Sequence, residues 1–166
     1  MGKRIRQYIG IFAAVIAYYF VHEGAHLVAA LHYGTFKKIN FMGLGMQIDA
    51  YTDRMTHFQL GIFCLAGAVS TVLIGWLLVL LCKRICTIKS KVLKTAMWYI
   101  SLSILLIDPL YLSILCGFFG GGDMNGISLL VPELAARIVY GLLLPVNAAV
   151  FIKVILPRYK RAFQAE

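Results

Sequence analysis

The chain has 166 residues, of which 61% are hydrophobic and only 14% are charged, whereas about a quarter of the residues in an average soluble domain are charged. A soluble fold of this length could not bury so much apolar surface, so the composition excludes a soluble globular domain. The net charge of +9 does not indicate a nucleic-acid partner, because the basic residues lie in short clusters beside apolar runs, where such residues act as signals of membrane topology.

The apolar residues form four long runs, each near the roughly 20 residues that a membrane-spanning helix needs. No internal repeat or linker divides them, so residues 1–166 are expected to form a single integral-membrane domain. We predict an all-α polytopic membrane protein with about four transmembrane helices. The predicted spans are about 7–33, 57–82, 95–119 and 134–156.

The basic residues predict an orientation in the membrane. The N-terminal end, the 83–94 loop and the C-terminal end together carry 12 of the 16 Lys and Arg residues. By the positive-inside rule, both termini are expected in the cytoplasm, and the 34–56 and 120–133 loops on the other side. The expected location is therefore multi-pass, in the cell membrane of a prokaryote.

The first span contains the sequence His22-Glu23-Gly-Ala-His26. In a helix, this spacing places two imidazoles one turn apart on one face, so that both can bind one Zn²⁺ ion with the glutamate beside it. Each ionisable group within a spanning helix costs about 2.5–3.5 kcal/mol, and a bound metal would compensate for three of them. We predict that His22 and His26 bind zinc and that Glu23 is the catalytic general base for a metal-activated water.

Residues 35–52, between the first two spans, partly alternate apolar and polar side chains, and Gly43 and Gly45 bracket a turn. This pattern predicts a short β-hairpin. Its apolar character indicates that the hairpin is associated with the membrane.

A catalytic zinc site needs a third protein ligand and an open position. Asp123 follows the third span in a glycine-rich segment, residues 117–126, at the membrane depth of the two histidines, and is the preferred candidate. Asp108 is the alternative third ligand. It lies deeper in the span, directly before Pro109, which should kink the helix because proline removes a helical hydrogen bond.

Three features make the chain resemble the site-2 protease family of intramembrane zinc metalloproteases. They are the His22–His26 motif in a spanning helix, Ala66-Gly67 in the next span, and an aspartate followed by a glycine-containing segment near the end of a later span. The resemblance implies a minimal zinc endopeptidase that cuts a membrane-embedded or membrane-proximal peptide. It also implies that the hairpin holds an extended substrate by strand addition.

The chain departs from the family pattern in its second motif. The family usually has Ala-Gly-Pro-x-x-Asn, whereas Ala68 and Thr71 stand here for the proline and the asparagine. In the third motif, Met-Asn separates Asp123 from the following glycine. In better-known members the zinc-binding helix also runs from outside to cytoplasm, opposite to the charge-based orientation. Residues expected to contact substrate are Gly43, Gly45, Thr71 and Asn125.

Two other functions fit the same residues. A non-proteolytic transporter or proton-relay bundle would use His22, Glu23, Asp108 and Asp123 for transport without a metal. A catalytically silent scaffold would keep the metal site and bind a partner. For the protease, the expected partners are a membrane protein or peptide substrate and the lipid bilayer.

Overall fold

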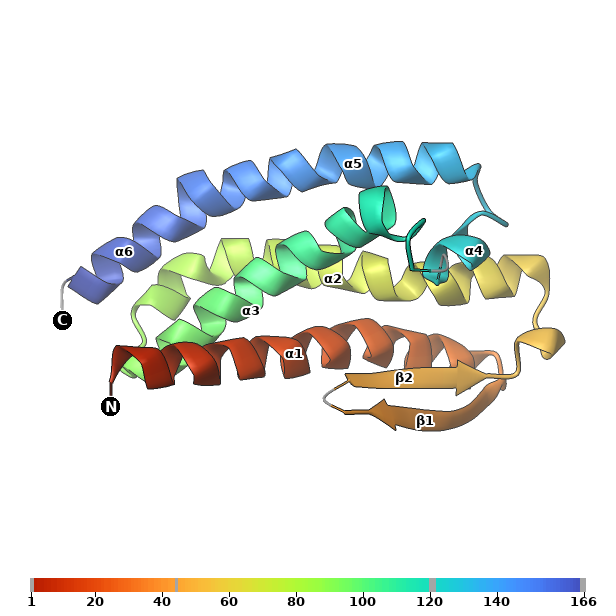
Figure 1. Ribbon diagram of the computed structural model, residues 1–166, viewed down its shortest axis with the longest axis horizontal. Helices are drawn as coiled ribbons and strands as arrows, with labels where there is room; N and C mark the ends of the chain where they lie inside the picture. The colour runs from red at the N-terminus through yellow and green to blue at the C-terminus, as the bar shows by residue number, and fades with distance from the viewer. Residues whose placement is uncertain (1, 44, 120–121, 165–166) are drawn as a thin grey trace.

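A computed structural model describes residues 2–43, 45–119 and 122–164. Four helical segments lie along one another in an elongated bundle, with both termini at the same end (Figure 1). Each segment is long and apolar enough to cross a membrane, which confirms the predicted all-α polytopic fold. The four segments are Lys3–His32, His57–Cys86, Lys91–Leu115 and Glu133–Gln164.

The first two segments are the uninterrupted helices α1 (Lys3–His32) and α2 (His57–Cys86). The start of α2 is set by Thr56 and Gln59, whose side chains each accept the backbone N–H of the other. This capping box satisfies two donors that a helix start otherwise leaves unpaired. Both helices extend beyond the predicted 7–33 and 57–82 into their flanking basic residues.

The predicted β-hairpin is present between α1 and α2. Strands β1 (Phe36–Met42) and β2 (Gly45–Ala50) pair antiparallel. Gly43 in the turn has φ +61°, a left-handed conformation that favours glycine. β2 lies between α1 and β1 (Figure 1), and a short 3₁₀ turn, η1 (Thr52–Arg54), leads on to α2.

The third segment differs from the predicted span 95–119. Its regular helix, α3 (Lys91–Leu110), begins earlier because the Ser90 side chain accepts a backbone N–H of the first turn. After Pro109 the helix widens into a π-helical turn, η2 (Tyr111–Leu115), and the spanning segment ends there. Such wider turns accommodate interruptions of the α-helical hydrogen-bond pattern.

A polar contact joins the third and fourth segments at this proline. Pro109 has no N–H, so the carbonyl of Leu105 has no helical donor. The Nδ2 atom of Asn147, on helix α5 (Glu133–Val150), donates to that carbonyl at 2.8 Å. Asn147 is fully buried, so its amide replaces a hydrogen bond that lipid could not supply.

Part of the glycine-rich segment after η2 forms the short helix α4 (Asp123–Ile127), which was not predicted from the sequence. Gly120 and Gly121 lie outside the described residues. α4 packs directly on α2 because Gly126 has no side chain, and a Cβ there would overlap Cys64. The last segment continues past the predicted residue 156 to Gln164.

In the last segment, α5 is followed by a second π-helical turn and a basic C-terminal helix. These are η3 (Phe151–Ile155) and α6 (Leu156–Gln164).

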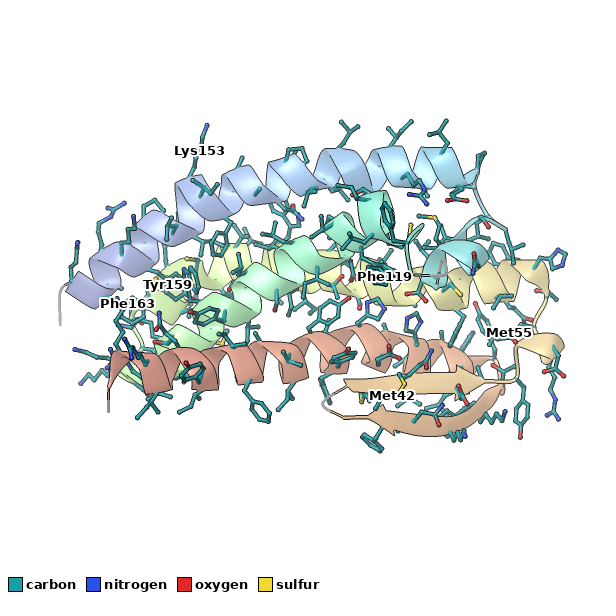
Figure 2. The ribbon with its side chains drawn as sticks, viewed as in Figure 1. Met42, Met55, Phe119, Lys153, Tyr159 and Phe163 are labelled. Atoms are coloured by element: carbon teal, nitrogen blue, oxygen red, sulfur yellow. The ribbon has the colours of Figure 1, made fainter. Side chains whose placement is uncertain are left out.

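Buried apolar side chains form two clusters. One lies towards the hairpin end and includes Met55, and the other lies towards the end with the termini and includes Tyr159 (Figure 2). The polar residues of the predicted metal site adjoin the first cluster.

Candidate metal centre

His22 and His26 lie one turn apart on α1, and both side chains are buried, with 8% and 4% of their surface exposed. Their Nε2 atoms face the same oxygen, Oδ2 of Asp123, at 3.1 Å and 3.5 Å. The structure therefore brings the two histidines together with the preferred third candidate, although Asp123 lies 97 residues after His26 in the sequence.

The hydrogen bond of His26 identifies the nitrogen that carries its proton. Nδ1 lies 2.7 Å from the backbone carbonyl oxygen of Phe63 on α2. A carbonyl oxygen can only accept, so Nδ1 must donate. In neutral His26, Nε2 then carries the lone pair that could bind a metal.

Asp108 has the corresponding role for His22. Its Oδ2 lies 3.1 Å from Nδ1 of His22, while its carboxylate also accepts from the hydroxyls of Tyr18 and Thr71. An ionised carboxylate can accept all three bonds, and Nδ1 of His22 then donates. Asp108 thus contacts the imidazole on the opposite nitrogen from Asp123, as the outer partners of metal-binding histidines do.

Asp123 is held in its ionised form. Burial alone would raise the pKa of its carboxyl, but the hydrogen bonds and charges of His22 and His26 outweigh burial and hold the pKa well below its usual range. The lowered pKa requires protons on the two Nε2 atoms, and a zinc ion that replaced these protons would be surrounded by two imidazole lone pairs and an anionic oxygen.

The separations of these atoms fit a zinc ion. Ligand atoms about 2.0–2.1 Å from a tetrahedral zinc lie about 3.3–3.4 Å from one another, close to the observed 3.1 and 3.5 Å. Two histidines and one carboxylate form a known donor set for catalytic zinc. His22, His26 and Asp123 are thus the residues that would hold the ion.

Gly67 on α2 makes room for the two imidazoles. A Cβ atom at this position would lie 2.6 Å from Nε2 of both His22 and His26, closer than packed atoms allow. The glycine of the Ala66-Gly67 pair therefore leaves space beside the two nitrogens, a role that only the folded arrangement of α1 and α2 reveals.

A second glycine positions Asp123. Gly122, directly before it, has φ +46°, and a Cβ there would lie 2.5 Å from the Tyr111 hydroxyl. Both constraints favour glycine at the start of α4. The close approach of η2 to this turn brings Asp123 towards α1.

Glu23 lies beside the two histidines and contacts the hairpin. Its Oε2 accepts the backbone N–H of Ile48 on β2 at 2.9 Å. One ligand atom from each of His22, Glu23 and His26 lies within 4.8 Å of the others. The carboxylate is therefore close enough to exchange a proton with a molecule bound at the centre.

The four residues expected to contact substrate occupy different surroundings. Thr71 is fully buried, and its hydroxyl bonds to Asp108, so it supports the position of that carboxylate. Gly43 is exposed at the hairpin turn, and Gly45 packs against Tyr19 of α1. Asn125 is exposed on α4.

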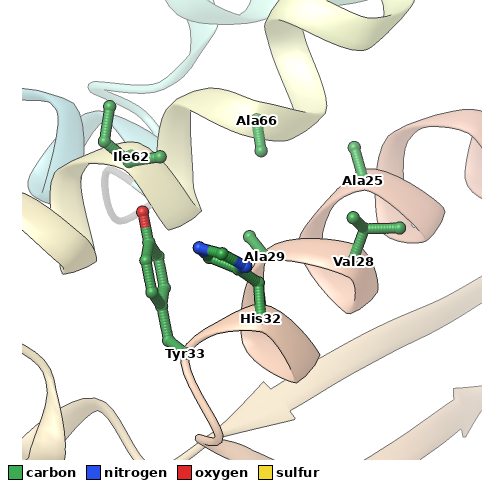
Figure 3. A pocket seen from close by; sticks show the side chains of 7 residues that line it. All are labelled: Ala25, Val28, Ala29, His32, Tyr33, Ile62 and Ala66. Atoms are coloured by element: carbon green, nitrogen blue, oxygen red, sulfur yellow. The ribbon is translucent and has the colours of Figure 1, made fainter.

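A pocket of about 430 Å³ opens between α1 and α2 next to the centre (Figure 3). The small side chains of alanine leave this space between the two helices, and His32 and Tyr33 line one side of it. Its walls are mostly apolar, which suits an acyl chain or an apolar peptide side chain. The lining residues are Ala25, Val28, Ala29, His32, Tyr33, Ile62 and Ala66.

We expect Asp108→Asn to weaken zinc binding about 10- to 100-fold, the usual effect of losing an outer partner of a metal ligand. The amide cannot accept all three hydrogen bonds that the carboxylate accepts. A chelator-competition titration of the purified protein measures the change. Tyr18→Phe removes one bond to Asp108 but keeps its contact with His22, so its effect should be smaller. Wild-type affinity in Asp108→Asn would contradict this role.

The centre thus unites α1, α2, α3 and α4, with Glu23 held at its edge by β2. His22, His26 and Asp108 are buried, and Glu23 and Asp123 are partly buried, inside a bundle of membrane-spanning length. Neither a scan against protein-family models nor searches of curated proteins and of solved structures found a match to this chain.

Proposed function

We propose that this chain is an intramembrane zinc metalloprotease of the site-2 protease type, which hydrolyses a peptide bond of a membrane-embedded or membrane-proximal substrate. The convergence of two Nε2 atoms and one ionised carboxylate oxygen, at 3.1 and 3.5 Å, carries the proposal. Two histidine nitrogens and a carboxylate oxygen placed in this way form a donor set of catalytic zinc, and the adjacent glutamate suits hydrolysis.

Each residue of the centre has a distinct role in the proposed reaction. When bound, zinc supplies Lewis-acid activation of a water and of the substrate carbonyl. Glu23 takes the proton of the attacking water and returns a proton to the amine that leaves. Asp108 and the Phe63 carbonyl hold the two imidazoles in the required tautomer and orientation.

The hairpin supports a peptide as the substrate. The Ile48 N–H points away from β1 and towards Glu23, so this edge of β2 lies beside the proposed base. An extended segment that pairs with this edge would have to take the place of its contact with α1, and it would then run past the centre with its backbone aligned. A helical substrate must unwind to expose a peptide bond, and strand pairing stabilises the unwound segment.

Metal analysis tests the proposal. Purified wild-type protein, loaded with zinc and desalted, should contain one zinc per chain. Asp123→Asn should weaken zinc binding more than 100-fold, beyond the effect of an outer partner, because an amide is a poor ligand without charge. Asp53→Asn is the matched control, since Asp53 is exposed on η1 away from the centre, and should bind zinc like the wild type.

Cleavage is measured with a panel of single-span membrane peptides, tagged at both ends and reconstituted with the enzyme. Zinc-dependent cleavage that Asp123→Asn abolishes would support the protease. A metal-free protein that conducts protons in liposomes and loses this conductance in Asp123→Asn would instead establish the relay, and zinc binding without cleavage of any peptide would favour the scaffold.

A further inference from the structure

A second pocket, of about 640 Å³, lies at the end of the bundle that holds both termini. It is bounded by the start of α1, the start of α3 and helix α6. Tyr159 and Phe163, at this end in Figure 2, form part of its wall. The metal centre adjoins the opposite end, so this pocket belongs to a different site.

The charge of the pocket has one sign. Four cationic side chains from three helices line the pocket: Lys3, Arg6, Lys91 and Lys160. Among the described residues, no Asp or Glu lines it. Within the described part of the chain, Lys3 and Lys160 form no ion pair. A further cation, Lys94, is buried behind the wall with its Nζ 5.4 Å from the Phe163 ring centre. The pocket therefore favours an anion.

The remaining lining combines hydrogen-bond donors with aromatic rings. Gln7, Thr95 and Gln164 are polar, whereas Trp98 and Tyr99 provide apolar surface on the side that continues into the span. Trp and Tyr are enriched where headgroups meet acyl chains. The pocket thus has a cationic mouth and an amphipathic wall at the expected depth of the headgroups.

We propose that this pocket binds the phosphate group of an anionic phospholipid from the leaflet at the end with the termini. Basic pockets between spanning helices on the cytoplasmic side recognise acidic headgroups. The volume is within the usual range of ligand sites, about 300–1,000 Å³. A bound lipid would join α1, α3 and α6, three elements that the sequence separates widely.

Native mass spectrometry of the full chain in neutral detergent, titrated with phosphatidylglycerol or phosphatidylcholine, tests the proposal. Lys3→Gln/Lys160→Gln should weaken phosphatidylglycerol binding roughly thirtyfold, since each basic residue contributes about fivefold near anionic lipid. Both side chains are exposed, so the fold should survive. The control Lys83→Gln/Lys89→Gln removes two exposed charges from the same end outside the pocket and should bind like the wild type.

Equal losses in the two double variants would show a general attraction to charge and overturn the proposal. Equal binding of both lipids by the wild type would do the same. A final titration adds inorganic phosphate in the millimolar range: unchanged lipid binding supports a lipid ligand, whereas displacement would assign the pocket to a soluble phosphate compound.

Discussion

Replacing Glu23 with Gln should abolish peptide hydrolysis while leaving one zinc per chain. The amide cannot take up the proton of the attacking water, and a positioned general base contributes about 10²- to 10⁴-fold to such reactions. The glutamine carbonyl can still accept the Ile48 N–H, which Glu23 binds at 2.9 Å, so β2 should keep its place. Cleavage rate and zinc content are measured on the same sample.

Glu133→Gln is the matched control for Glu23→Gln. Glu133 is exposed at the start of α5 and pairs with Arg137, so its loss should change neither cleavage nor zinc content. If Glu23→Gln cleaves at the wild-type rate, Glu23 is not the base. If the variant loses its zinc together with its activity, Glu23 is a metal ligand and the roles proposed for Glu23 and Asp123 are wrong.

Replacing Gly67 with Ala should remove zinc although no metal ligand changes. The added methyl group would lie 2.6 Å from Nε2 of both His22 and His26. The methyl group is fixed to the backbone of α2 and cannot turn aside. The imidazoles must therefore move away from Asp123 to relieve the overlap. We expect a loss of zinc affinity beyond the roughly 100-fold seen for outer partners, measured by metal content after desalting.

Gly24→Ala provides a control within the motif itself. A Cβ at Gly24 meets no atom within 4 Å, and alanine in place of glycine favours a helix by about 0.5–1 kcal/mol. This variant should keep full zinc content and activity and unfold at a higher temperature. Circular dichroism should show wild-type helix content in both variants. One zinc per chain in Gly67→Ala would contradict the position assigned to the ion.

The parts of the fold that depend on local pattern could be predicted from the sequence. Apolar runs of spanning length predicted four helices, and alternation with Gly43 predicted the hairpin. The ends were less accurate, because caps such as Ser90 carry helices into their basic flanks. α4 was missed because its helical turn follows a run of glycines whose composition predicts an irregular loop.

The candidate centre was predictable only in its side chains. His22 and His26 share a helical spacing, and membrane depth narrowed the third candidate to Asp123 or Asp108. The Phe63 carbonyl that orients His26 could not have been found, since a backbone group has no sequence signature. Tyr18 lies one helical turn before His22. This spacing was a signal that the tyrosine hydroxyl could bond to the same carboxylate as His22, namely that of Asp108.

The bond from Asn147 to the Leu105 carbonyl has a consequence for assembly. In lipid, apolar helix faces gain little from burial and slide past one another at low cost. Pro109 leaves one carbonyl of α3 in need of a donor, and a shift of α5 by one turn would leave two buried polar groups unpaired, at about 1–3 kcal/mol each. The N–H that Pro109 lacks thereby sets the axial alignment of α3 and α5. Pro109 directly follows Asp108, whose carboxylate faces His22.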